Sequence, residues 1–418
     1  MQPPQDLLKQ IFHAAVAACH PDVVVPRCLP PRPDGRVLVL GAGKASAAMA
    51  AAVEACWDAP LAGTVVTRYG HGAATRWVRV IEAQHPVPDA ASRRAGGEIL
   101  SLASGLSEED TVLVLLSGGG SALMAAPLPS LDLEAKQALT RQLVLSGASI
   151  SQINCVRKHL SAVKGGRLAA RAFPARTLTI AVSDVANDDP SVIASGPTVA
   201  DPSTQQDALQ ILKQFGIDAP PSVQRIIEDA ALETPKPGDP RLSRSTYVCA
   251  ARGSDLISAA CDEAHRLGIR TMVLGLGIEG DARRVARAHA EIALSQQQAE
   301  VPLLLLSGGE LTVSVTGPGS GGPNREYLLA MAQALRGADH IWVLAADSDG
   351  IDGSDDVAGG WIGPETLVRA GQASLDPEDL ARRNDSAALF RTLSQEIKTG
   401  PTRTNVNDFR AILILPQK

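Results

Sequence analysis

The residue types that suit phosphate chemistry gather in a few short segments of this chain. The first is Gly41-Ala42-Gly43-Lys44-Ala45-Ser46, which follows an apolar run and precedes an Ala-rich one. A glycine turn that opens a helix can direct backbone N–H groups and the positive end of the helix dipole towards an anion. We therefore expect Gly41 and Gly43 to bind a phosphate and Lys44 to act in catalysis beside it. The alternative is a tight strand-to-helix turn without a ligand.

Two known phosphate motifs resemble this turn, and it matches neither. A Walker A loop would have glycine where Leu38 stands and Ser or Thr where Ala45 stands. A dinucleotide fingerprint would have its third glycine at Ser46 and an acidic residue near Arg68. The pattern therefore favours an anion site of another kind.

A second glycine segment, Ser117-Gly118-Gly119-Gly120-Ser121, ends a strongly apolar run. Three consecutive glycines cost chain entropy, and this cost is justified where the backbone must come close to another group. We expect all five residues to contact a phosphate. A sharp chain reversal is the alternative.

A dense cationic segment spans residues 154–167 and contains Arg157, Lys158 and Lys164. Helical spacing would place Arg157, Ser161 and Lys164 on one face. Lys158 and Lys164 are candidates for phosphate binding, and Arg157 for substrate binding, because Lys and Arg bind phosphate and carboxylate groups. A surface helix with solvated charges is the alternative.

Carboxylates cluster in Ser183-Asp184-Val185-Ala186-Asn187-Asp188-Asp189, directly after an apolar run. Ligand sites of α/β proteins lie at the carboxyl ends of strands. Asp184 is our candidate for catalysis, and Asp188 and Asp189 for Mg²⁺ coordination. A helix cap followed by a loop is the alternative for each Asp.

The second half of the chain carries further candidates. Arg325 and Asn324 follow a glycine-rich loop, and Glu310 ends the sequence Leu-Leu-Ser-Gly-Gly-Glu, an echo of residues 115–120. We assign Arg325 to catalysis, Asn324 and Glu310 to substrate binding, and Asp349 and Asp352 to a metal. The Asp-rich stretch that holds these two is not an EF-hand, because it lacks Glu at the twelfth position and follows a predicted strand.

Short apolar runs alternate with Ala-rich helical stretches, which is typical of α/β proteins. The Pro-rich segment 233–243 interrupts this alternation. We predict two α/β domains, at residues 1–236 and 245–418. The predicted strands are at 37–40, 64–67, 78–81, 112–116 and 178–182 in the first domain, and at 246–250, 271–274, 303–306, 311–315, 341–345 and 411–415 in the second.

Composition excludes several classes of protein. The 418 residues carry a net charge of −6, with Lys and Arg spread along the chain, so no basic stripe for nucleic acid is expected. The six cysteines form no C-x-x-C pair, and the N-terminus lacks the pattern of a signal peptide. No apolar run reaches the ~18 residues of a membrane span. We predict a cytoplasmic protein that binds neither nucleic acid nor membrane.

Taken together, these segments resemble the glycerate 2-kinase family. The likeness rests on Gly-Ala-Gly-Lys-Ala-Ser, Ser-Gly-Gly-Gly-Ser-Ala-Leu, Asn-Cys-Val-Arg-Lys-His-Leu-Ser-Ala-Val-Lys-Gly-Gly-Arg and Ser-Asp-Val-Ala-Asn-Asp-Asp-Pro. In the second half, Leu-Leu-Ser-Gly-Gly-Glu-Leu-Thr-Val, Asp-Gly-Ile-Asp-Gly and Thr-Asn-Val-Asn-Asp-Phe are similar to the family's C-terminal "MOFRL" domain. The likeness runs in order from near residue 5 to near residue 414.

The resemblance implies a Rossmann-like N-terminal domain, a smaller C-terminal domain and an active site in the cleft between them. It implies transfer of the γ-phosphoryl group of ATP to D-glycerate, giving 2-phosphoglycerate, with Mg²⁺ as cofactor. The family's important lysine falls on Lys44, and its Ser-Asp-Val aspartate on Asp184. Its usual arginine position holds Pro323, which leaves open whether Arg325 substitutes.

Three readings of function follow. The first is a glycerate 2-kinase, either monomer or homodimer. The second is an NAD(P)H-dependent hydroxypyruvate reductase, a label that members of the family often carry and that Gly41-x-Gly43 would suit. The third is a non-enzymatic protein that binds a nucleotide or a sugar acid.

Overall fold

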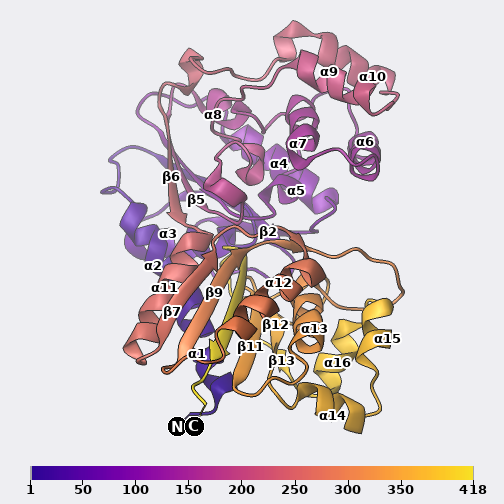
Figure 1. The fold of residues 1–418 in the computed structure, drawn as a ribbon. Coiled ribbons are helices and arrows are strands. Elements are labelled where there is room, and N and C mark those ends of the chain that lie inside the picture. Colours follow the sequence, from indigo (N-terminus) through magenta and orange to yellow (C-terminus); the bar gives the residue numbers. More distant parts are fainter. Residues whose placement is uncertain (1, 418) are drawn as a thin grey trace. The chain divides into compact units, whose positions relative to one another are not determined.

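A computed structural model of the chain describes residues 2–417. The chain forms two compact domains, each with its own sheet (Figure 1). The first domain consists of Val24–Ala250. The second consists of Ala251 onwards together with the described residues up to Val23. The structure thus divides the chain differently from the predicted ranges of 1–236 and 245–418.

The first domain is built on a six-stranded sheet with the order β3-β2-β1-β4-β5-β6. Its strands are β1 (Val37–Ala42), β2 (Ala62–Arg68), β3 (Arg79–Ala83), β4 (Thr111–Leu116), β5 (Arg176–Val182) and β6 (Ser245–Ala251). The pairs β1–β2, β1–β4, β2–β3 and β4–β5 are parallel. The strand order reverses between β1 and β4, which is where open α/β sheets bind ligands.

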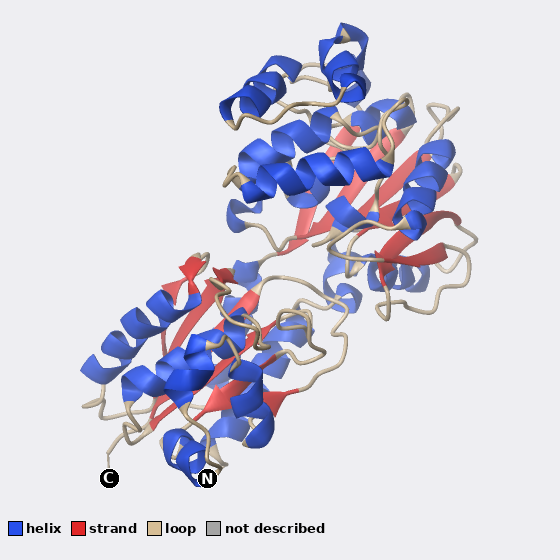
Figure 2. Cartoon of the chain, turned by 90° about the vertical axis from the view of Figure 1, so that its right-hand side faces the viewer, coloured by secondary structure: helices blue, strands red, loops and turns tan. Residues whose placement is uncertain are grey.

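Helices cover both faces of this sheet (Figure 2), and every residue of β1 and β4 is therefore buried. The helices of this domain are α3 (Ser46–Cys56), α4 (Ala90–Leu102), α5 (Gly120–Leu123), α6 (Leu133–Leu145), α7 (Ile150–His159), α8 (Arg167–Ala172), α9 (Gln205–Gln214) and α10 (Pro221–Glu228), and the boundary between the domains falls within α2 (Pro21–Cys28). Ser149 and Thr204 begin α7 and α9 with reciprocal capping boxes. Helices α6, α7, α9 and α10 share a separate apolar cluster that includes Leu139, Val156 and Leu212.

The second domain has a mixed sheet with the order β13-β12-β11-β14-β9-β7. Its strands are β7 (Arg270–Gly275), β9 (Leu303–Gly309), β11 (Ile341–Asp347), β12 (Gly359–Ile362), β13 (Glu396–Ile397) and β14 (Asp408–Ile414), and β8 (Gly280–Asp281) pairs with β10 (Leu311–Thr312) separately. β14 runs antiparallel to both β9 and β11, while β7 is parallel to β9. The helices are α1 (Pro4–Ala18), α11 (Gly253–Arg266), α12 (Ala282–Ser295), α13 (Pro323–Leu335), α14 (Thr366–Gln372), α15 (Pro377–Arg382) and α16 (Ser386–Thr392).

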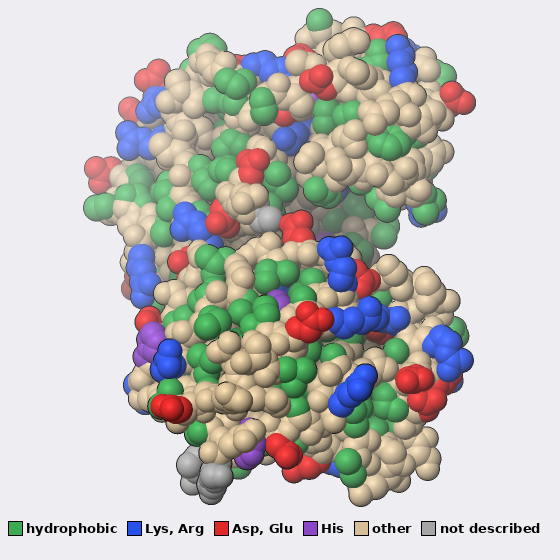
Figure 3. Space-filling view, viewed as in Figure 1, with side chains coloured by type: hydrophobic (Ala, Val, Ile, Leu, Met, Phe, Trp, Pro, Cys, Tyr) green, Lys and Arg blue, Asp and Glu red, His purple; other side chains and the backbone are tan. Residues whose placement is uncertain are grey.

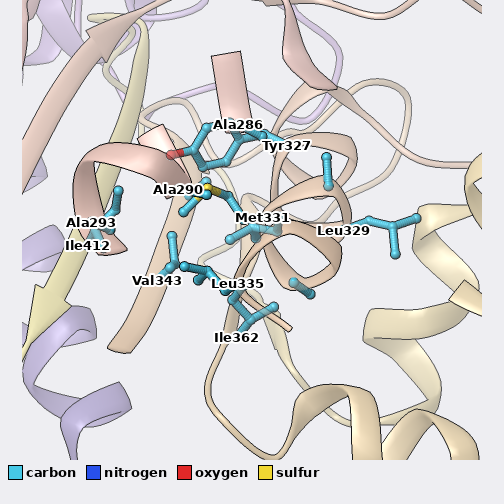
Figure 4. Packing of buried hydrophobic residues seen from close by; sticks show 14 of the residues in the cluster. Ala286, Ala290, Ala293, Tyr327, Leu329, Met331, Leu335, Val343, Ile362 and Ile412 are labelled. Carbon is cyan, nitrogen blue, oxygen red and sulfur yellow. The ribbon is translucent and has the colours of Figure 1, made fainter. Parts of the chain in front are cut away.

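The core of the second domain lies between α12, α13 and the sheet. Figure 4 shows Tyr327 and Met331 of α13 beside Ala286 and Ala290 of α12, and all four side chains are at most 1% exposed. The small alanines let the two helices approach closely, so that the large side chains of α13 fill the space between them. This packing fixes the start of α13, where Arg325 lies.

Two elements fall outside the predicted organisation. β6 was expected to open the second domain, but it is the edge strand of the first sheet. Helix α1 packs on α11 and β11 of the second domain, although the sequence places it at the opposite end of the chain. Both assignments depend on contacts between distant residues, which local patterns do not contain.

The predicted α/β fold is confirmed, and the molecular surface shows how its charges are distributed. On the face drawn in Figure 3, Lys and Arg side chains lie scattered among Asp and Glu side chains. None of the helices within residues 2–417 has the length and apolar character needed to cross a membrane.

Candidate functional site

Three of the predicted segments meet at one edge of the first sheet. The loops at 43–46, 117–121 and 183–195 follow β1, β4 and β5, which are neighbouring parallel strands. The N–H of Lys44 donates to the carbonyl of Gly118 over 2.9 Å, and Ser121 Oγ lies 2.8 Å from Ser195 Oγ. The sequence therefore identified segments that the fold does bring together.

The glycine turn at 41–46 differs from the anion cradle that we expected. Four consecutive N–H groups already donate to protein oxygens: Gly43 to Val66 O (3.0 Å), Lys44 to Gly118 O (2.9 Å), Ala45 to Ser117 Oγ (2.9 Å) and Ser46 to Gly43 O (3.1 Å). A Cβ on Gly43 would lie 2.1 Å from Ser117 Oγ, and its φ is +140°. Gly43 is thus required for the close contact between two loops, and the N–H groups of this turn are engaged within the protein. The side chain of Lys44 is half-buried.

The loop at 117–121 has the free donors that the first turn lacks. Within the described residues, no protein oxygen accepts a hydrogen bond from the N–H groups of Gly118 and Gly119. Gly119 adopts the left-handed conformation, with φ of +80° and ψ of −10°. Successive N–H groups around such a residue form a concavity that binds anions. The triple-glycine segment therefore has the geometry of a phosphate-binding loop.

Two cations converge on the serine that ends this loop. Arg157 Nη2 donates to Ser121 Oγ over 2.7 Å, and Lys164 Nζ donates to the same atom over 3.0 Å and to Ser121 O over 2.6 Å. Burial lowers the pKa of Lys164 well below its ordinary value, and the nearby charges of Arg157 and Lys136 lower it further. An anion bound here would relieve this concentration of positive charge.

Not all of the cationic segment belongs to this site. α7 ends at His159, so Ser161 and Lys164 are not on a helical face with Arg157 as predicted. Arg157 and Lys164 meet instead because both reach Ser121. Lys158 is buried and forms an ion pair with Asp201 at 3.3 Å. This pair favours a structural role for Lys158 over the predicted phosphate binding.

Lys136 of α6 is a member of this cationic cluster that sequence reasoning missed. Its Nζ donates to the carbonyl of Leu160, at the C-terminal end of α7, over 3.1 Å. Burial above all, together with the charges of Arg157 and Arg167, lowers its pKa to about 7. The signal in the sequence was weak, because a lone lysine on an amphipathic helix ordinarily points to solvent.

The aspartates after β5 lie in a strained loop. Asp184 and Asp188 are half-buried, whereas Asp189 is exposed and accepts a hydrogen bond from Ser191 N over 2.8 Å. Asp188 has φ of +52° and Ala194 φ of +51°, in the region that non-glycine residues seldom adopt. Strain of this kind is common in functional loops. Among the described residues, no group of three His, Cys, Asp or Glu side chains is arranged to hold a metal ion.

In the second domain, Arg325 lies on the first turn of α13, as predicted, but it is fully buried. Asp352 accepts from Arg325 Nε over 2.8 Å, from Arg325 N over 3.1 Å and from Asn324 N over 2.9 Å. Arg325 Nη2 also donates to Asp355 Oδ2 over 2.9 Å. Protein groups thus engage Nε and Nη2 of Arg325 and both oxygens of Asp352, while Nη1 of Arg325 has no hydrogen-bond partner among the described residues. These bonds do not favour the predicted roles of Arg325 as a ligand clamp and of Asp352 as a metal ligand.

Arg410, which sequence reasoning also missed, fixes the Ser-Gly-Gly segment at residues 307–309. Arg410 is buried within β14, and its Nη2 donates to Gly308 O over 2.6 Å and to Gly309 O over 3.2 Å. Its Nη1 donates to Asp408 Oδ2 over 3.2 Å. A single arginine inside an apolar strand was the signal available in the sequence. This contact sets the backbone from which the exposed Glu310 projects.

Asn324 and Asp349 are both buried in the second domain. Asn324 Nδ2 donates to Asp408 Oδ1 over 2.7 Å, and burial raises the pKa of Asp408 to about 6. Asp349 Oδ1 accepts from Ile351 N over 2.8 Å. The predicted roles of Asn324 in substrate binding and of Asp349 in metal binding stay predictions.

Comparison with known proteins supports the relationship that the motifs suggested. The profile of a domain of unknown function, DUF4147, matches residues 7–228, and that of the MOFRL family matches residues 303–408. The chain is 39% identical to the D-glycerate 2-kinase of Thermotoga maritima, over 99% of both chains. The chain belongs to the glycerate 2-kinase family. A family member from Agrobacterium vitis that is 47% identical, over 98% of this chain and 94% of that protein, carries the provisional name hydroxypyruvate reductase.

The fold agrees with that of a solved glycerate kinase. The crystal structure of the Thermotoga maritima enzyme superimposes with a TM-score of 0.89 and 38% identity, covering 98% of this chain and 99% of that one. The chain therefore shares the fold of that enzyme over almost its whole length.

Proposed function

We propose that the protein is a kinase that transfers the γ-phosphoryl group of ATP to the 2-hydroxyl of D-glycerate. The observation that carries this proposal is the full-length identity of 39% to a protein named D-glycerate 2-kinase. The geometry of the first domain is consistent with it, because phosphoryl transfer depends on positioning and on neutralising charge.

The loop at 117–121 would hold a phosphate of ATP. Its free N–H groups at Gly118 and Gly119 supply two donors, and Arg157 and Lys164 supply positive charge beside Ser121. Ser117 and Gly120 would shape this loop, since Ser117 Oγ accepts from Ala45 N over 2.9 Å.

Further residues belong to the proposed site in the first domain. Lys44 would add a cation at the point where the strand order reverses. Asp184, the candidate for catalysis, and Asp188 and Asp189, the candidates for metal binding, lie in the loop after the neighbouring strand β5 and offer oxygen donors of the kind that Mg²⁺ prefers. Mg²⁺, when bound, would neutralise charge on the phosphates of ATP. Glu310 and Asn324 remain candidates for contact with glycerate.

The reductase is the second candidate, because the name of the Agrobacterium vitis relative points to it. The β1 turn argues against a dinucleotide pyrophosphate there. Ser46 stands where the third glycine of a fingerprint belongs, and its Oγ donates to Gly43 O and Val66 O over 2.9 and 2.7 Å. The turn's N–H groups at 43–46 are also engaged within the protein.

Product analysis tests the proposal. The purified protein is mixed with ATP, Mg²⁺ and D-glycerate, ADP formation is followed, and the product is examined by phosphorus NMR. We expect ADP formation that requires glycerate, and 2-phosphoglycerate as the product. Finding only 3-phosphoglycerate would contradict the position of transfer. Oxidation of NADPH by hydroxypyruvate, without kinase activity, would favour the reductase, and neither activity would favour a binding protein.

The oligomeric state and the location of the protein stay predictions. We propose a monomer or homodimer in the cytoplasm, as the sequence suggested. The predicted placement of the reaction between the two domains also stays a prediction.

A further inference from the structure

A histidine outside all the predicted segments lies directly against the glycine loop. A Cβ on Gly119 would lie 2.9 Å from Cδ2 and 3.0 Å from Nε2 of His85. The edge of the imidazole ring therefore packs on the backbone of Gly119, in space that any other residue's side chain would take. His85 lies in the loop after β3, and its side chain is half-buried.

The position of this ring relates it to the groups that would hold phosphate. The N–H groups of Gly118 and Gly119 have no acceptor among the described residues. Ser121, two residues beyond Gly119, receives hydrogen bonds from Arg157 and Lys164. A phosphate held by these donors would thus lie next to a group that is able to exchange protons.

The surroundings also indicate which role the imidazole can fill. Arg157 supplies a guanidinium beside the loop, and the Nζ atoms of Lys164 and Lys136 already donate hydrogen bonds to Ser121 and to Leu160 O. A guanidinium or an ammonium group only donates hydrogen bonds. Transfer to a hydroxyl also needs a group that accepts its proton, and neutral imidazole is such a group.

We propose that His85 is a catalytic residue that accepts the proton of the substrate's 2-hydroxyl. The proposal rests on the proposed kinase function. As the hydroxyl oxygen bonds to the γ-phosphorus of ATP, its proton passes to a ring nitrogen of His85. The bond from the γ-phosphorus to the β–γ bridging oxygen breaks, and ADP leaves with that electron pair. The imidazolium then releases its proton to water.

His85→Ala and His85→Gln test the role directly. General base catalysis contributes about 10²–10⁴-fold, so we expect kcat to fall by about 10²-fold or more in both variants. KM for ATP should stay within about threefold, because the loop and its cations remain. Added imidazole should restore part of kcat in His85→Ala and have no effect on His85→Gln, whose side chain fills the space. A ring that only supports the loop would show no such rescue.

A pair of glycine variants tests the position of the His85 ring, because one of them displaces the ring and the other does not. Gly119→Ala and Gly147→Ala place alanine at almost the same backbone angle, φ of +80° and +79°, so both carry similar backbone strain. Only Gly119 has His85 against it, since a Cβ on Gly147 would meet nothing within 4 Å. We expect Gly119→Ala to lose kcat and Gly147→Ala to keep it at an equal melting temperature.

The outcomes distinguish the proposed role of His85 from the proposed kinase function on which it rests. If the unaltered protein does not phosphorylate glycerate, the proposed function fails. If it does, and His85→Gln and His85→Ala keep more than about half of its kcat, His85 is not the proton acceptor. Loss of kcat in His85→Ala without rescue by imidazole, accompanied by a lower melting temperature, would likewise overturn the proposal and make the ring a structural support.

Discussion

Arg325 Nε donates to Asp352 Oδ2 over 2.8 Å, and both side chains are fully buried. This pair joins the first turn of α13 to the loop after β11. A cation at the start of a helix is unfavourable. The carboxylate of Asp352 offsets that cost, because it accepts from the guanidinium and from two backbone N–H groups at the helix start. The charge of Arg325 is therefore balanced within the protein.

We expect Arg325→Gln to act on stability. Removing one partner of a buried ion pair leaves the other charge uncompensated, so the free energy of unfolding should fall by about 3–5 kcal/mol in urea denaturation. Arg382→Gln removes an exposed ion pair of the same domain and should cost less than about 1 kcal/mol. Unchanged stability together with a tenfold loss of kcat/KM would instead favour the predicted ligand clamp.

Sequence patterns predicted the fold well where the signal is local. Strands β1 and β4 are fully buried apolar runs because both faces are covered, and such runs are easy to recognise. β6 was assigned to the wrong domain because its pairing with β5 depends on residues about 70 positions away. The short strands β12 and β13 were missed, since two to four residues give no periodicity.

A second prediction compares two neighbouring residues of α7. Arg157 donates to Ser121 Oγ over 2.7 Å, whereas Lys158 pairs with Asp201 at 3.3 Å. We expect Arg157→Gln to raise KM for ATP by about tenfold or more, because a charge-assisted contact to phosphate is lost. Lys158→Met should leave KM within about threefold and lower the melting temperature. Steady-state kinetics and thermal unfolding of both variants measure the contrast, and equal KM values would contradict the assignment.

The sequence predicted which segments form the candidate site, but it did not predict which of their atoms are available to a ligand. Glycines and charged residues marked the loops after β1, β4 and β5, and the sheet brings these together. The sequence did not reveal that the N–H of Lys44 is engaged by Gly118 O, 74 residues away. The same limit applies to Arg410, whose partners lie about 100 residues earlier. Hydrogen bonds between distant loops decide which donors remain available, and local patterns do not show them.

A third prediction concerns Lys44, whose backbone is fixed while its side chain stays half-buried at the reversal of strand order. A cation directed at the transferring phosphoryl group acts mainly in the transition state. We expect Lys44→Ala to lower kcat on the order of 10²-fold or more, with a smaller change in KM for glycerate. Lys44→Arg, which keeps the charge, should retain more activity than Lys44→Ala. Near-normal kcat in Lys44→Ala would make Lys44 a surface residue of the turn.

The final prediction uses the buried amine of Lys136, whose pKa is lowered to about 7. In the unfolded chain a lysine titrates near 10.4. Between these two values the unfolded state binds a proton that the folded state does not. The free energy of unfolding should therefore rise with pH across this window, by up to about 1.4 kcal/mol per pH unit. Below pH 7 both states are protonated, and this contribution no longer changes.

Lys136→Met removes the titrating group and should flatten the curve of unfolding free energy between about pH 7 and 10. Urea denaturation of the first domain at several pH values, compared with the unaltered protein, gives the difference. Leu139→Ala on the same helix is the control, because Leu139 is buried and does not titrate. It should lower stability by about 2–5 kcal/mol at every pH alike. If the curve for Lys136→Met runs parallel to that of the unaltered protein, Lys136 stays charged when buried. Its hydrogen bond to Leu160 O would then be the main compensation for the cost of burying that charge.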